Sequence, residues 1–236
     1  MSMIEIDVDD EQTLQLWAAV GELAEWLPGE WTLIGGLMVQ LHAVEHGIAD
    51  VRPTFDVDIL GQARPQHTLG AIDVALRDAG FELIGPDLDG YAHRYQRGKL
   101  VVDVLAPDGI KPPARLGAGR KAVGVPGGSQ ALSRSEAVMV TVRGRTFELR
   151  RPTLLGAVLI KARSLMVHSD PATQREDLLR LLALIDDPRA MAAELRKTER
   201  TWLRAAEGRL RLSEPSTLDA EDLRRATLAY RLLTRA

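Results

Sequence analysis

Three aspartates have the residue type and the spacing that metal-dependent chemistry requires. Asp56 and Asp58 are two apart in the run Phe-Asp-Val-Asp, and Asp103 lies in Leu-Val-Val-Asp-Val-Leu. Side chains two apart on a strand point to the same face, so the first two carboxylates would together attract a cation. If the strand of Asp103 lies beside theirs, the three groups form an all-oxygen site of the kind that magnesium binds. This arrangement indicates two-metal chemistry at phosphorus.

Each of these residues also has a purely structural interpretation. Asp-x-Asp pairs are common in proteins that bind no metal there, and Asp103 could be a salt-bridged residue of the core. A buried carboxylate without a partner is costly, so Asp103 needs a cation under either interpretation. Adjacent strands favour the metal site, whereas carboxylates far apart would exclude it.

Gly35 and Gly36 could hold a phosphate. They stand between a predicted strand and a predicted helix, where a phosphate can approach the backbone and meet the free amides of the first helical turn. A Gly-Gly pair by itself is more often an ordinary tight turn. The order of the chain favours the phosphate interpretation, because strand, glycine pair and helix precede a strand with Asp56 and Asp58 and a later strand with Asp103.

The elements that must position these residues follow from the hydrophobic periodicity. We predict helices over residues 10–26, 37–46 and 66–79, and strands over 31–34, 55–60, 81–84, 92–96 and 100–105. The stretch 107–135 is rich in Gly, Pro and Arg and has no period, so we predict a long loop. Residues 137–142 and 146–149 flank Arg-Gly-Arg and predict a hairpin.

The second half of the chain has helical periodicity. We predict helices over residues 153–168, 171–186, 188–210 and 219–235. The fold class is therefore α+β, with a mixed sheet and flanking helices over residues 1–150 and a helical bundle over residues 151–236. We expect the first part to carry the catalytic groups and the second to contribute to nucleotide and acceptor binding.

The composition excludes several classes of protein. The chain has no cysteine, which excludes disulfides, thiolate zinc sites and a cysteine nucleophile. It has no run approaching the roughly 18 apolar residues of a membrane-spanning helix, and its acidic first residues do not resemble a signal peptide. We expect a cytoplasmic protein with no membrane partner.

The charge is unevenly distributed. The first 60 residues are strongly acidic, whereas the interval 111–166 has only Glu136 and Glu148 as acids. Its basic residues are Lys111, Arg115, Arg120, Lys121, Arg134, Arg143, Arg145, Arg150, Arg151, Lys161 and Arg163. Such a basic sector could bind polyphosphate or RNA, because arginine matches phosphate geometry. A solvated face is the alternative.

The order of these motifs resembles the nucleotidyltransferase superfamily of the polymerase-beta type. That superfamily has a Gly-Gly or Gly-Ser turn, an Asp-x-Asp pair and a third acid on a later strand. Within it, the segments 31–42 and 52–58 resemble the AbiEii group, which includes the MenT-type toxins of toxin-antitoxin pairs. The resemblance covers about residues 30–180 and implies a nucleotidyltransferase fold for the first part of the chain. The interval from Gly36 to Asp56 is longer than in compact members, so residues 48–53 are expected to form an extra loop.

The resemblance also implies roles for residues beyond the three aspartates. Lys161 stands where the group has a triphosphate-binding lysine, and Asp177 where it has an aspartate that orients a base or the lysine. Lys161 lies among apolar residues and needs an anion, although snorkelling to the surface would also explain it. The remaining expected nucleotide contacts are Gly35, Gly36, Arg52, Thr54 and Arg163.

These residues together predict a reaction. An acceptor hydroxyl would attack the α-phosphorus of a nucleoside triphosphate, with two Mg²⁺ ions on Asp56, Asp58 and Asp103 and with Asp103 as general base. The resemblance points to the 3′ end of tRNA as the acceptor, to a toxin, and to a cognate antitoxin as partner. One alternative is an adenylyltransferase acting on a small molecule or a protein. Another is a non-catalytic protein that binds a nucleotide or an antitoxin.

Two further groups of residues invite a functional interpretation. His42 and His46 are four apart on a predicted helix, a spacing that can bind zinc, but no third nitrogen ligand supports this and we expect packing instead. Trp17, Trp26 and Trp31 could stack on bases, but we expect them in the core.

Overall fold

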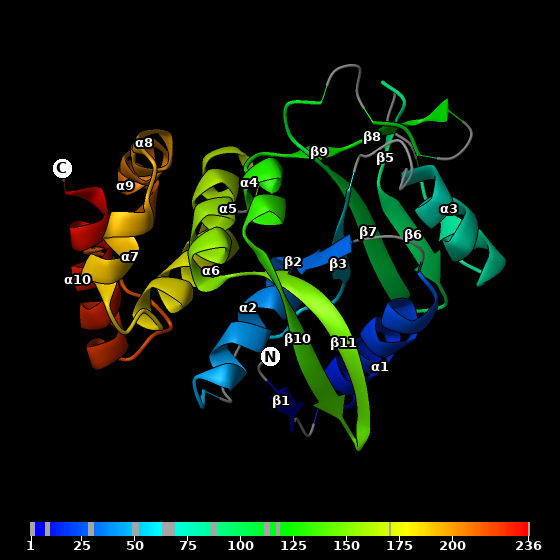
Figure 1. Cartoon of the computed structure of the whole chain (residues 1–236), viewed down its shortest axis with the longest axis horizontal. Coiled ribbons are helices and arrows are strands. Elements are labelled where there is room, and N and C mark those ends of the chain that lie inside the picture. Colours follow the sequence, from blue (N-terminus) through cyan, green and yellow to red (C-terminus); the bar gives the residue numbers. More distant parts are fainter. Residues whose placement is uncertain are drawn as a thin grey trace. The chain divides into compact units, whose positions relative to one another are not determined.

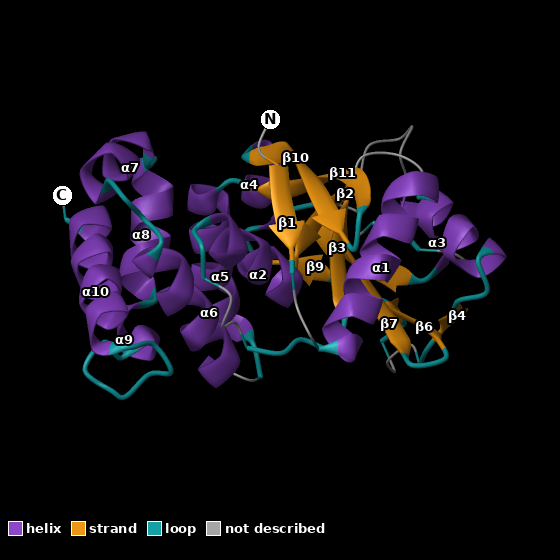
Figure 2. Cartoon of the chain, turned by 90° about the horizontal axis from the view of Figure 1, so that it is seen from below, coloured by secondary structure: helices purple, strands orange, loops and turns teal. Residues whose placement is uncertain are grey.

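The computed structural model describes residues 3–7, 10–27, 31–48, 52–62, 69–85, 89–110, 114–116, 119–169 and 171–235. The chain forms two compact units, Met1–Pro152 and Thr153–Ala236 (Figure 1). The first unit holds the strands, whereas the described part of the second is built from helices (Figure 2). The expected α+β fold class is confirmed.

The larger sheet of the first unit has six strands. They are β2 (Trp31–Ile34), β3 (Val57–Gly61), β7 (Leu100–Pro107), β6 (Arg94–Arg97) and β4 (Glu82–Leu83) in spatial order, with β9 (Gly124–Val125) paired to β7. β3 and β7 are parallel, while β2 pairs with β3 and β6 pairs with β7 in the antiparallel sense. The sheet is therefore mixed, and β3 and β7 are its neighbouring central strands.

A second sheet of three strands lies beside the first. Its strands, in order, are β1 (Met3–Ile6), β10 (Ser135–Val142) and β11 (Arg145–Pro152). The predicted hairpin is confirmed: β10 and β11 pair over their full lengths across Arg143 and Gly144, which both have positive φ, as a two-residue hairpin turn of this kind requires. β11 also packs beside β2, so the two sheets share one core.

The helices of the first unit cover these sheets. They are α1 (Glu11–Trp26), α2 (Gly35–Glu45), α3 (Leu69–Asp78) and α4 (Gly128–Ser133). α1 begins at the Asp10 cap, whose carboxylate accepts from the Thr13 amide at 2.7 Å. It packs its apolar face against β10 and β11. α2 is buried along seven consecutive residues from Leu37 to Ala43, which makes it a central helix.

The tryptophans lie in this core or at its margin. Trp17 is fully buried and its indole donates to Gln40 Oε1 at 2.9 Å, so its polar group is satisfied. Trp31 is also buried, and Trp26 packs half-buried against the core. Their expected role as core residues is confirmed.

The second unit consists, over its described residues, of helices joined by short connections. They are α5 (Leu154–Val167), α6 (Pro171–Ala183), α7 (Pro188–Glu194), α8 (Lys197–Ala205), α9 (Glu207–Leu210) and α10 (Ala220–Thr234). The single helix predicted over 188–210 was wrong. Leu195 and Arg196 are extended, and the Arg196 amide donates to the buried Glu199 carboxylate at 2.8 Å, which starts α8 as a separate helix.

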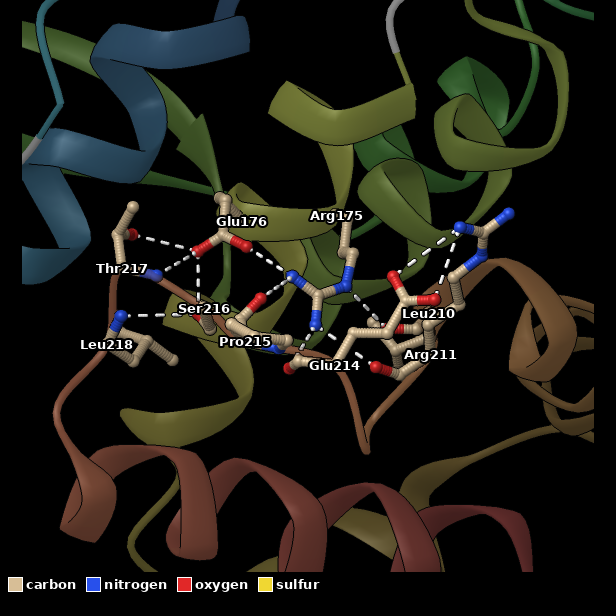
Figure 3. A network of polar contacts seen from close by, with 9 residues as sticks. All are labelled: Arg175, Glu176, Leu210, Arg211, Glu214, Pro215, Ser216, Thr217 and Leu218. Atoms are coloured by element: carbon tan, nitrogen blue, oxygen red, sulfur yellow. Dashed lines mark hydrogen bonds and ion pairs between the residues drawn. The ribbon is translucent and has the colours of Figure 1, made fainter.

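Arg175 holds the connection between α9 and α10 in place (Figure 3). Its buried guanidinium donates to four backbone carbonyls, those of Leu210, Arg211, Glu214 and Pro215, at 2.8 to 3.1 Å. The adjacent Glu176 carboxylate accepts from Ser216 Oγ at 2.6 Å and from Thr217 at 2.8 to 2.9 Å. An otherwise irregular segment is thereby fixed to α6.

Several other predicted elements differ from the observed ones. β3 begins at Val57, so Asp56 lies just before the strand, and Phe55, which began the predicted strand, is 63% exposed. The predicted strand 92–96 is divided between β5 (Tyr91–Ala92) and β6, because β5 pairs instead with β8 (Lys121–Ala122). Residues 66–68 of one predicted helix and residues 49–51 of the expected extra loop lie outside the described residues.

The predicted long loop over 107–135 was wrong in part. It contains β8, β9 and α4, which are too short to leave a periodic pattern. They are fixed by groups distant in sequence: β8 by β5, β9 by β7, and α4 by Asp108, whose carboxylate accepts from the amides of Gly127 and Ser129 at 2.9 and 3.0 Å.

Candidate active site

The three aspartates come together on the larger sheet. β3 and β7 are parallel neighbours, and Asp58 stands directly opposite Asp103 in their register. Each of Asp56, Asp58 and Asp103 offers one carboxylate oxygen within 4.8 Å of the other two. The expected convergence of these three side chains is confirmed, although Asp56 reaches the cluster from the segment before β3.

The cluster lies at the edge of the core. Asp103 is only 6% exposed, whereas Asp56 and Asp58 are half-buried. Hard divalent cations such as Mg²⁺ prefer oxygen ligands, and the three carboxylates supply them. The residues present therefore fit a magnesium site in the chemistry of their donor atoms.

Gly35 allows the backbone to approach Asp58. An ideal Cβ on Gly35 would lie 1.8 Å from Asp58 Oδ2, and the residue has a φ of +72°. Asp58 pairs across the sheet with Ile34, the residue before Gly35, which brings the beginning of α2 against the carboxylate. Both the contact and the backbone conformation therefore require glycine at this position.

Gly36 makes a second close approach. An ideal Cβ there would lie 2.6 Å from Thr54 Oγ1 and 3.3 Å from Arg52 Nη2. Thr54 is buried and its hydroxyl donates to Asp56 Oδ1 at 3.4 Å. The glycine pair thus connects the start of α2 to the segment that delivers Asp56, and the N-cap residue, Ile34, makes no side-chain cap hydrogen bond. The amides of a helix N-terminus suit a phosphate.

Arg94 belongs to the cluster and was not predicted from the sequence. It stands opposite Asp103 in the antiparallel β6–β7 pair. Its Nε donates to Asp103 Oδ1 at 2.9 Å, and its Nη2 donates to Asp103 Oδ2 at 2.7 Å and to Asp56 Oδ2 at 3.3 Å. The pKa of Arg94 is raised, chiefly by its hydrogen bonds to Asp103 and also by the negative charges of Asp103, Asp56 and Asp58. Partial burial of the guanidinium lowers the pKa but does not cancel this rise. No local signal identifies Arg94, because only the pairing of β6 with β7 places this arginine on Asp103.

Lys161 and Asp177 form a buried pair within the second unit. Lys161 Nζ donates to Asp177 Oδ2 at 2.7 Å and to Gln174 Oε1 at 3.2 Å, and both charged side chains are nearly inaccessible. The anion that Lys161 needs is therefore Asp177, and the ammonium does not snorkel to the surface. The expectation that Asp177 orients this lysine agrees with the contact. Arg163 lies over the Trp202 ring, with its guanidinium carbon 5.1 Å from the ring centroid.

Several residues of the basic sector already have acidic partners. Arg151 is 2% exposed and pairs with Glu45 and Glu136. The exposed Arg143 and Arg145 pair with Glu11 and Glu25 of α1. The sector is thus partly neutralised within the fold, and Lys111 lies outside the described residues.

The histidines of α2 are packing residues. His42 is buried and its Nε2 hydrogen-bonds the Pro152 carbonyl at 3.0 Å. Burial above all, with the nearby Arg151 charge, lowers the pKa of His42 to about 3. His46 Nδ1 contacts the His42 carbonyl at 2.8 Å. These contacts agree with the packing role expected from the sequence.

Comparison with known proteins bears on the fold. No protein-family model matches the chain, and no curated protein matches it. Among solved structures, an antigenic nucleotidyltransferase-like protein from Paracoccidioides brasiliensis is similar over 92% of this chain and 94% of its own, with a TM-score of 0.54 and 14% sequence identity. Within the described residues, none of the helices has both the length and the apolar character needed to span a bilayer. At this identity the likeness shows that the chain shares the fold of a nucleotidyltransferase-like protein.

Proposed function

We propose that the chain is a metal-dependent nucleotidyltransferase that moves a nucleoside monophosphate from a nucleoside triphosphate to an acceptor hydroxyl. The observation that carries the proposal is the meeting of Asp56, Asp58 and Asp103 on adjacent elements, directly against the Gly35–Gly36 start of α2. The similar structure from Paracoccidioides brasiliensis supports it, because that protein is described as nucleotidyltransferase-like and shares the fold.

The proposed reaction follows from the positions of these groups. The acceptor oxygen bonds to the α-phosphorus as the bond from that phosphorus to the bridging oxygen breaks, and pyrophosphate leaves. Asp103 takes the proton of the acceptor hydroxyl. Mg²⁺ held by the three aspartates would neutralise the charge on the attacking and leaving oxygens. Thr54 steadies the Asp56 carboxylate through their hydrogen bond.

The triphosphate would lie along the start of α2. The amides of the first turn of α2, which begins at Gly35, would face it, and Arg52, whose Nη2 lies beside Gly36, would add a positive charge. By the resemblance to the AbiEii group, Lys161 and Arg163 would contact the triphosphate. Within the second unit the Lys161 ammonium is already paired with Asp177 and Gln174, so it would bind phosphate only by giving up these contacts.

The acceptor is proposed from the resemblance to the AbiEii group and its MenT-type toxins. It is the 3′ end of tRNA, and the chain acts as the toxin of a toxin-antitoxin pair whose antitoxin blocks it. A small molecule or a protein side chain as acceptor is the rival outcome, and binding without turnover is the other.

Transfer from each of four α-labelled nucleoside triphosphates onto total RNA tests the proposal. The chain should label a tRNA-sized band from one or more of them and release pyrophosphate. Asp58→Asn should lower the rate by at least about 1000-fold, because it weakens the oxygen ligand set without changing side-chain volume. Glu82→Gln is a matched control, since it removes an exposed carboxylate of β4 from the same sheet.

The pattern of failure distinguishes the alternatives. Label on protein or on a small molecule would replace the tRNA acceptor and leave the transferase chemistry standing. Full activity of Asp58→Asn would reject the metal mechanism. Nucleotide binding without release of pyrophosphate under any condition would show that the chain binds nucleotides without catalysing transfer.

A further inference from the structure

Arg94 engages the carboxylate cluster as a fork. Two of its nitrogens bind the two oxygens of Asp103, and one of them also reaches Asp56. The register of β6 and β7 fixes this pairing, because Arg94 and Asp103 are direct partners in the antiparallel ladder. The contact is therefore built into the sheet and does not depend on the conformation of a loop.

A guanidinium in this position competes with a metal ion for the same atoms. It donates hydrogen bonds to the carboxylate oxygens, and it has no acceptor atom with which to coordinate a cation. The three carboxylates and Arg94 together carry a formal charge of −2, from three negative groups and one positive group. Without Arg94 the charge would be −3, which attracts a divalent cation more strongly.

The side chain has room to withdraw. Arg94 is 45% exposed, whereas the Asp103 side chain that it binds is 8% exposed. Arg151 in the same unit is the opposite case: it is 2% exposed and held between Glu45 and Glu136. The Arg151 guanidinium is enclosed by the fold, whereas the half-exposed Arg94 guanidinium can move into solvent and free both oxygens of Asp103. The arriving cation would then balance the buried Asp103 charge.

We propose that Arg94 is a positioning residue that binds the carboxylate oxygens in place of the metal. A cation can then coordinate Asp103 only after the guanidinium has moved away from it. The inference rests on the proposed function, because it takes the three aspartates as the metal site. Before the metal binds, Arg94 forms ion pairs with both Asp103 and Asp56. These ion pairs offset the electrostatic repulsion among the three neighbouring carboxylates. Arg94 also lowers the affinity of the resting protein for free metal.

Titration of the full chain with Mn²⁺, followed by the paramagnetic resonance signal of the unbound ion, measures this competition directly. Arg94→Gln should bind Mn²⁺ at least about tenfold more tightly than the natural sequence, because the competing charge is gone. Arg97→Gln is the matched control. It removes an arginine of the same strand that pairs with Glu22 of α1, and its affinity should equal that of the natural sequence.

Thermal unfolding separates competition from loss of fold. Arg94→Gln leaves Asp103 without its partner and should have a lower melting temperature than the natural sequence. Saturating Mn²⁺ should raise the melting temperature of Arg94→Gln by more than it raises that of the natural sequence. Arg94→Lys keeps a charge but loses the fork, so its Mn²⁺ affinity should fall between those of Arg94→Gln and the natural sequence. A purely structural arginine would lower stability without raising metal affinity.

Asp58→Asn distinguishes the two ways of failing. If it abolishes Mn²⁺ binding while Arg94→Gln binds no more tightly than the natural sequence, the metal site stands and the competition by Arg94 is rejected. If no protein of the series shows Mn²⁺ binding that depends on Asp58, both this inference and the proposed metal-dependent function are rejected.

Discussion

Two charged clusters, one in each unit, differ in how their charges balance. In the first unit Asp56, Asp58 and Asp103 lie together with Arg94, which pairs with Asp56 and Asp103, and the cluster is partly open to solvent. In the second unit Lys161 and Asp177 pair one to one, and both are buried. An excess of acid at an accessible place invites a cation, whereas a balanced buried pair needs nothing further.

The comparison changes how the buried lysine is understood. From the sequence, Lys161 among apolar residues indicated a missing anion, and phosphate was one candidate. The structure supplies that anion from within the same unit, as Asp177, together with Gln174 Oε1. Burial and residue type alone do not show whether a buried charged side chain binds a ligand or is already neutralised by a neighbour. The net charge that remains after the internal ion pairs are counted does distinguish these cases.

The largest expected effect is on stability, and it should differ between the clusters. Asp177→Asn should destabilise the chain by about 3–5 kcal/mol, because it leaves the Lys161 ammonium buried and uncompensated. Asp56→Asn should cost less than about 1 kcal/mol or stabilise, because it relieves repulsion among three carboxylates at a half-buried position. Urea unfolding measures both. Equal destabilisation by the two variants would remove the distinction between the clusters.

A smaller effect tests the close approach at Gly35. Gly35→Ala should cost about 2–3 kcal/mol and weaken metal binding, because its Cβ would collide with the Asp58 carboxylate in addition to the strain of a positive φ. Gly47→Ala is the matched control: Gly47 has nearly the same φ, +76°, but its Cβ would meet nothing within 4 Å. Its cost should be limited to backbone strain, about 1–2 kcal/mol. Equal unfolding free energies and unchanged metal affinity for both variants would argue against the contact with Asp58.

The sequence was informative where local pattern determines structure. The period of two placed Asp58 on a strand face, and the apolar neighbours of Asp103 placed it on another strand. The hairpin over β10 and β11 was predictable because Arg143 and Gly144 suit a two-residue turn. These short-range signals identified the candidate metal ligands, whereas the pairing of β3 with β7 that brings them together is long-range.

The sequence did not predict features that depend on pairing between residues far apart in the chain. β1 was not predicted because four residues gain their structure from β10, more than 130 positions away. Arg94 was missed for the same reason: a lone arginine has no local signal, and only the β6–β7 register places it on Asp103. The break between α7 and α8 depends on the single Glu199 carboxylate that accepts from the Arg196 amide.

The most direct test of the account is a crystal of the full chain grown with Mn²⁺ and measured for anomalous scattering. We expect a peak bounded by the carboxylates of Asp56, Asp58 and Asp103, with the Arg94 guanidinium turned away from Asp103. A structure at saturating Mn²⁺ with Arg94 still bound to Asp103 and no peak between the three carboxylates would contradict it.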